Sequence, residues 1–63
     1  MKLTKLMSEM MVKLEEANQE AYKFEDKGNN ASSTRLRKAM QEIKAMANDV
    51  RSIVMDIRNE RKK

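Results

Sequence analysis

The fold is decided by the stretch DKGNN at residues 26–30, which contains the only glycine of the 63-residue chain. Glycine can adopt the left-handed conformation that ends a helix, and asparagine can accept hydrogen bonds from the free N–H groups that begin one. The stretch therefore predicts that one helix ends near Gly28 and that a second begins shortly after it. Either asparagine could cap the second helix, and so could Ser32, Ser33 or Thr34, so its first residue stays open by a few positions.

On each side of this stretch, apolar residues recur at alternating steps of four and three, a spacing that places them on one side of a helix. Before the glycine the row is Leu3, Met7, Met10, Leu14, Ala17, Ala21 and Phe24. After the glycine the row is Leu36, Met40, Ile43, Ala47, Val50, Val54 and Ile57. We predict one domain over residues 1–63, with helices at about 2–27 and 31–61 and a turn at 28–30. The fold class is all-α, an antiparallel two-helix hairpin with coiled-coil-like packing.

The short connection also predicts an alignment of the helices, in which residues whose numbers sum to about 60 lie opposite each other. Each helix carries more apolar surface than one neighbour can cover, and a chain of this size rarely builds a sufficient core alone. We therefore expect a homodimer that forms a four-helix bundle. The residues expected at the second interface are Met11, Val12, Met46 and Ile53. The alternative is a marginal monomer that folds only on its ligand.

The composition argues against several functional classes. The chain has no histidine and no cysteine, so it lacks the usual general base at neutral pH, the thiol nucleophile and the preferred zinc ligands. We expect no enzymatic activity, no metal, no cofactor and no small-molecule substrate. No apolar run exceeds three residues, so we expect neither a membrane span nor a secretory signal. The expected location is the cytoplasm.

Positive charge concentrates after the glycine. Residues 1–28 carry five lysines and six acids, whereas residues 29–63 carry nine lysines and arginines against four acids. Four of these bases recur every seven residues and share one side of the helix, and we call them the basic stripe: Arg37, Lys44, Arg51 and Arg58. They could form salt bridges between the helices or face phosphates. The expected register offers an acid to Arg37 alone.

A second group of bases and small polar residues surrounds the predicted turn. Free N–H groups and the positive end of a helix favour an anion there, hydroxyls can donate to phosphate oxygens, and arginine can bind them with two N–H groups. The alternative is an ordinary capped turn with solubilising bases. Together with the basic stripe, the candidate nucleic-acid-binding residues are Lys27, Asn29, Ser32, Thr34, Arg35, Arg37, Lys38, Lys44, Arg51 and Arg58.

The stretch FEDKGNNASSTRLRKAMQEIK at residues 24–44 resembles bacterial linker-histone-like proteins of the chlamydial type, which are small, lysine-rich, DNA-compacting nucleoid proteins. The most specific part is KGN at 27–29 followed by TRLRK at 34–38. Asn30 and Ser33 depart from the usual pattern. This sequence also has no tail rich in lysine, alanine and proline like that of chlamydial members, so we do not expect strong condensation by it alone. The resemblance implies sequence-tolerant binding of duplex DNA in the nucleoid.

Two other functions remain open. The methionine-rich apolar surface also suits a structural coiled-coil or adaptor module that binds a partner helix. RNA binding would use the same backbone electrostatics, and the chain has no set of stacking residues that would reveal a preference for single strands. The function favoured by the sequence is that of a histone-like, nucleoid-associated protein. It would bind double-stranded DNA through its phosphates and compact or bridge it as a dimer.

Overall fold

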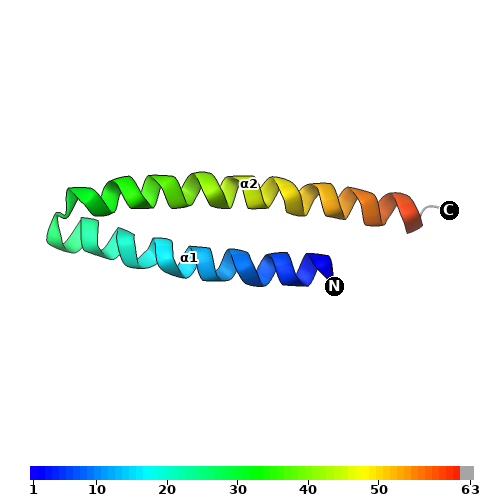
Figure 1. Ribbon diagram of the computed structural model, residues 1–63, viewed down its shortest axis with the longest axis horizontal. Coiled ribbons are helices and arrows are strands. Elements are labelled where there is room, and N and C mark those ends of the chain that lie inside the picture. Colours follow the sequence, from blue (N-terminus) through cyan, green and yellow to red (C-terminus); the bar gives the residue numbers. More distant parts are fainter. Residues whose placement is uncertain (62–63) are drawn as a thin grey trace.

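The computed structural model describes residues 1–61, which form two antiparallel helices joined by a tight turn (Figure 1). Helix α1 is Lys2–Lys27 and helix α2 is Asn30–Arg61. These residues contain no strand, and the predicted all-α hairpin is confirmed. The Cα atoms extend over 54 × 16 × 11 Å, and α2 continues past the beginning of α1 (Figure 1).

The turn consists of Gly28 and Asn29, and hydrogen bonds define both of its ends. Gly28 has φ 66° and ψ 28°, in the left-handed region, and its N–H donates to the carbonyl of Phe24 at 3.0 Å. Asn29 caps the next helix, because its Oδ1 accepts the N–H of Ser32 at 3.3 Å and its backbone carbonyl accepts the same N–H at 3.1 Å. The asparagine cap lets α2 begin at Asn30 rather than at about residue 31.

The helices align in a register that differs from the expected one. Two ion pairs cross between them, Lys13 with Glu42 and Arg35 with Glu20, and the two residue numbers sum to 55 in each pair. The expected sum of about 60 is therefore wrong. Only two residues separate the helices, and a shorter turn brings residues with a lower sum opposite each other.

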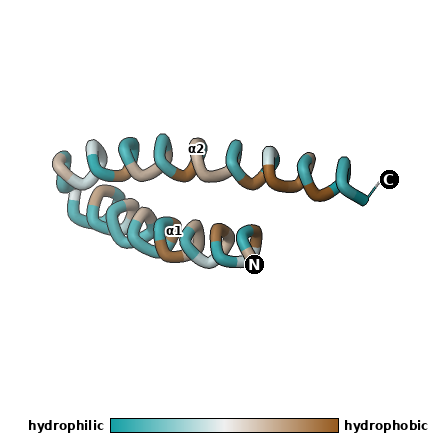
Figure 2. Tube along the Cα trace, turned by 45° about the vertical axis from the view of Figure 1, so that its right-hand side comes forward, coloured by the Kyte–Doolittle hydropathy of each residue, from teal (hydrophilic) through white to brown (hydrophobic). Residues whose placement is uncertain are grey.

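The hairpin has little core of its own. In the part of the chain that the structure describes, Ala17 is the only buried hydrophobic residue, at 2% exposure. The residues on the side of each helix that faces the other are half-buried. They are not fully buried because residues 1–61 form only these two helices, and no further element covers the seam between them. In α2 the half-buried residues include Leu36, Ala39, Ile43, Met46, Val50, Ile53 and Ile57. Figure 2 shows hydrophobic residues along the side of α2 that faces α1 and hydrophilic ones along its far side.

Four residues that the heptad rows place between the helices are instead exposed. They are Met7, Leu14, Phe24 and Met40, with exposed fractions from 42 to 56%. On α1, Lys13 and Glu20 share the side that faces α2, since their charged ends pair with that helix and their stems lie along it. These ion pairs rotate α1 relative to the expectation and leave part of the apolar surface without a partner.

Candidate nucleic-acid interface

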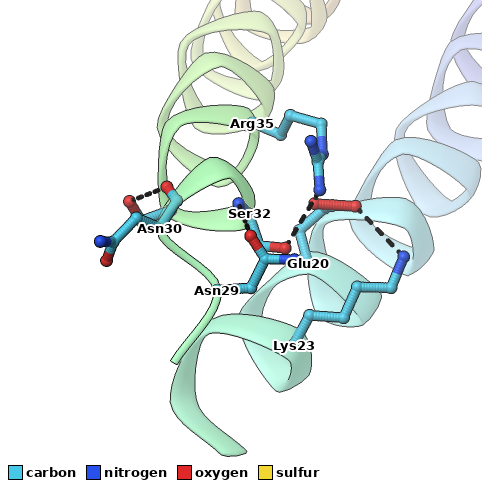
Figure 3. A network of polar contacts seen from close by, with 7 residues as sticks. Glu20, Lys23, Asn29, Asn30, Ser32 and Arg35 are labelled. Carbon is cyan, nitrogen blue, oxygen red and sulfur yellow. Dashed lines mark hydrogen bonds and ion pairs between the residues drawn. The ribbon is translucent and has the colours of Figure 1, made fainter. Parts of the chain in front are cut away.

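At the turn, polar side chains of both helices form one network around Ser32, with the carboxylate of Glu20 between two bases (Figure 3). Arg35 donates from Nε to Glu20 Oε2 at 2.7 Å and from Nη2 to Ser32 Oγ at 3.1 Å. Lys23 Nζ lies 3.7 Å from Glu20 Oε1. Ser32 is fully buried, and Asn29 accepts its N–H. The network fastens the first turn of α2 to α1.

The network also sets the charge state of Glu20. The hydrogen bond from Arg35 is the largest influence and lowers the pKa of Glu20 below its ordinary value of 4.5, while partial removal from water opposes the change. Attraction by Lys23 adds to the lowering of this pKa. Glu20 is therefore ionised at neutral pH and compensates the charge of Arg35.

Three of the candidate binding residues are thus already engaged within the hairpin. Ser32 has no exposed surface, so its hydroxyl does not reach a phosphate in this conformation. Asn29 uses its side-chain oxygen as the cap of α2. Arg35 keeps 52% of its side chain exposed, but its Nε and Nη2 already have partners. These residues shape the turn, although the Nη1 group of Arg35 keeps N–H donors that the network does not use.

The second interhelical ion pair lies on the same side of the hairpin. Lys13 Nζ is 2.8 Å from Glu42 Oε2, and the hydrogen bond between them raises the pKa of Lys13 and lowers that of Glu42. Lys38 also lowers the pKa of Glu42, so it lies near this acid. A shallow polar depression joins these residues to Glu20 and Arg35. We call this side, defined by the pairs of Lys13 with Glu42 and of Glu20 with Arg35, the ion-pair face.

The basic stripe lies on the other flank of α2. Arg37 and Lys44 each follow a residue of the ion-pair face by two positions, which is about 200° around a helix. All four members of the stripe are exposed. Among residues 1–61, no carboxylate forms an ion pair with any of the four. The stripe therefore carries positive charge that no acidic side chain in this part of the chain compensates.

Acids follow the opposite flank of the same helix. Glu42, Asp49 and Asp56 are spaced seven residues apart, so they share one side, and Glu42 places that side on the ion-pair face. Helix α2 thus carries its acids on the same flank as Arg35 and Lys38, and the basic stripe on the other flank.

The bases near the turn do not form one cluster. Arg35 and Lys38 line the depression on the ion-pair face, whereas Arg37 belongs to the basic stripe. Lys27, the last residue of α1, and Thr34 are both exposed. The structure therefore divides the candidate residues into an acid-free row along α2 and a mixed-charge group at the turn.

A helical hairpin with such a row suits a structural protein that binds a polyanion. The family model described as histone H1-like protein Hc1 matches residues 4–60, a range that includes the turn and most of both helices. The chain belongs to this histone-like, DNA-binding family, which is structural rather than enzymatic, and the resemblance at residues 24–44 is confirmed. No curated protein and no solved structure matches the chain. Neither helix, as far as Arg61, has an apolar stretch that could cross a membrane.

Proposed function

We propose that this chain binds double-stranded DNA through its phosphates, with little sequence specificity. The observation that supports the proposal best is the basic stripe, whose four cations have no acidic partner within the described hairpin. Consecutive members are about 10.5 Å apart along the helix axis, so the stripe spans about 30 Å. Duplex DNA carries one negative charge per about 1.7 Å of its axis, so each cation of such a row can find a phosphate.

The remaining candidate residues have two different roles in this proposal. Lys27, Thr34 and Lys38 are exposed near the turn and add contacts to the end of the stripe. Asn29, Ser32 and Arg35 act indirectly, because they fix the start of α2 and so the direction of the stripe. Contacts with phosphate position a protein on the duplex without reading its bases, which accounts for the low specificity.

The protein would act as a homodimer in the nucleoid, where two DNA sites in one particle bridge or compact the duplex. The small core and the exposed apolar residues support a dimer, since Met11 is 70% and Leu14 is 56% exposed. Val12 is 60% exposed, but it lies on the outer side of α1, about 200° around the helix from Leu14, and would be peripheral to that interface. Met46 and Ile53 are half-buried along the side of α2 that faces α1, so they contribute less free surface to a second interface.

A gel-shift titration with random-sequence duplex at several salt concentrations tests this proposal. Four phosphate contacts per hairpin predict a slope of log K against log salt of about −3 to −4 for each bound hairpin. The absence of any shift at low salt would eliminate the DNA-binding function. Competition with single-stranded DNA and with duplex RNA tests the nucleic-acid preference, and we expect both to compete less well than duplex DNA.

A further inference from the structure

We propose that two hairpins pack through one apolar face with both turns at the same end of the dimer. The inference rests on the proposed homodimer and adds its interface and its topology. The apolar face is defined by the side chains of Met7, Met11 and Leu14 on α1 and of Leu36 and Met40 on α2.

The apolar face is an open groove on the flank opposite the ion pairs. The groove has a volume of about 590 Å³, and its apolar lining is Met11, Leu14, Ala17, Ala21, Leu36 and Met40. Leu14 is 56% exposed and Met40 is 42% exposed, although both belong to the heptad rows. Because the ion pairs hold Lys13 and Glu20 against α2 on the other flank, these apolar side chains have no partner within the hairpin.

The dimensions of the face fit a second copy of this chain. A stable interface buries about 800 Å² on each partner. The whole side of the hairpin that carries this face measures 54 × 16 Å between its Cα extents, so an interface of about that area needs most of this side and not the groove alone. A second copy presents a side of the same dimensions with the same apolar groove, so the two sides can cover each other.

Two-fold symmetry allows two ways to stack these faces. With the axis along the hairpin, each α1 lies on the partner's α2 and both turns are at the same end. With the axis across the hairpin, each α2 lies on the partner's α2 and the turns are at opposite ends. Both arrangements bury the same side chains, so packing alone does not choose between them.

The basic stripe distinguishes the two arrangements. It borders the apolar face, because Met40 is three residues from Arg37 and four from Lys44. With the turns at opposite ends, the two stripes run beside each other and bring eight like charges together at the edge of the interface. With the turns at the same end, each stripe instead borders the partner's α1. Positions 11, 18 and 25 on that edge are methionine, asparagine and glutamate, none of them basic. Charge therefore favours the same-end arrangement.

This arrangement determines where DNA would bind. The two α2 helices occupy diagonally opposite corners of the bundle, so their stripes face away from each other. Each stripe could then hold one duplex, and a single dimer would bridge two. In the other arrangement both stripes share one side and serve a single duplex.

Distances between spin labels test the topology without DNA. The chain has no native cysteine, so single labels can be placed at Gln41→Cys near the middle of the hairpin and at Asp26→Cys beside the turn. We expect both variants to give pair distances of about 20–30 Å, the width of a bundle whose helix axes are about 10 Å apart. A distance of about 40 Å at Asp26, with a short one at Gln41, would show turns at opposite ends and overturn the inference. The absence of dipolar coupling at Gln41 would also overturn it.

A matched pair of substitutions tests the interface. Leu14→Asp lies in the groove and Val12→Asp on the outer side of α1, at 56 and 60% exposure. We expect the aspartate at position 14 to abolish the coupling between Gln41→Cys labels and the one at position 12 to retain it. The reverse pattern, or equal effects, would contradict the assignment of this face. These distances are measured without DNA, so they test the interface separately from DNA binding. A contradicted interface would leave the gel-shift result standing, and a gel shift without binding would leave the measured distances standing.

Discussion

The guanidinium of Arg35 donates to the carboxylate of Glu20 across the two helices, with 2.7 Å between Nε and Oε2. Arg37 is two residues further along α2 and forms no ion pair within residues 1–61. The two arginines therefore have different roles. Arg35 stabilises the hairpin, and Arg37 is available to an external anion.

This difference predicts opposite effects of two similar substitutions. Arg35→Gln removes an interhelical ion pair and should lower Tm by a few degrees while leaving the salt dependence of DNA binding nearly unchanged. Arg37→Gln should leave Tm unchanged and reduce the slope of log K against log salt by about 0.9, the value of one phosphate contact. Circular-dichroism melts and fluorescence-anisotropy titrations measure the two effects. An unchanged melt for Arg35→Gln, together with a reduced slope, would reverse the two roles.

The ion pairs also predict how stability depends on pH. The pKa values of Glu20 and Glu42 are lowered in the folded state from 4.5, mainly by hydrogen bonds from Arg35 and Lys13. Both carboxylates therefore stabilise the fold fully above their unfolded pKa, and this contribution is lost as the pH falls through the lowered values. We expect Tm to fall between about pH 6 and about pH 3, and to fall less in a variant with Glu20→Gln and Glu42→Gln. An equal fall of Tm in the wild-type chain and in the double variant would refute the assignment of this pH dependence to Glu20 and Glu42.

Lys13 gives the opposite dependence at alkaline pH. Its pKa is raised from 10.5 by the hydrogen bond with Glu42. The stabilisation is full below the unfolded pKa and is lost as the pH rises through the raised value. Thermal melts at alkaline pH should show a larger loss of Tm in the wild-type chain than in Lys13→Gln. Equal losses would show that another group is responsible.

Gly28 provides a test of the turn. Its φ of 66° is unfavourable for any residue with a Cβ, but a Cβ added here would meet no atom within 4 Å. Gly28→Ala should therefore cost about 1 kcal/mol through backbone conformation alone, which lowers Tm by roughly 4–8 °C in a domain of this size. Gly28→Asn should cost less, because asparagine tolerates the left-handed region. Equal Tm values for alanine and glycine would contradict the role of this residue.

The cap of α2 predicts a further change in stability. Asn29→Ala removes the side-chain acceptor for the N–H of Ser32 and should cost about 1 kcal/mol. Asn29→Asp should retain most of the stability, because its carboxylate can accept the same hydrogen bond. Denaturant unfolding followed by circular dichroism measures both. If the aspartate variant loses as much as the alanine variant, the side chain does not act as a cap.

The sequence was sufficient to predict the hairpin because the signals at the turn are local. A single glycine and an adjacent asparagine specify where one helix ends and the next begins, whatever the rest of the chain does. The heptad rows were also sufficient for two helices. The chain folds back at the only place where its helical pattern is interrupted.

The rotation and register of the helices were harder to predict from sequence. On α1, apolar residues occupy more than one row, and both Leu6 and Met7 can continue the row that contains Leu3 and Met10. The ion pairs decide between these rows, and they depend on a two-residue turn. A turn of that length places Glu20 near Arg35, whereas the expected register placed an acid near Arg37. Periodicity could therefore identify the basic stripe, but it could not tell which basic side chains would form an ion pair with an acid of the other helix.

The central claim is that the basic stripe provides the phosphate contacts, and a salt titration of two matched double variants tests it most directly. Arg51→Gln with Arg58→Gln removes two charges from the stripe, and Lys2→Gln with Lys5→Gln removes two exposed charges from the same end of the hairpin on α1. We predict that the stripe variant reduces the slope of log K against log salt by about 1.8, or 0.9 per contact, and that the α1 variant leaves it nearly unchanged. Equal slopes for the two variants would contradict the claim.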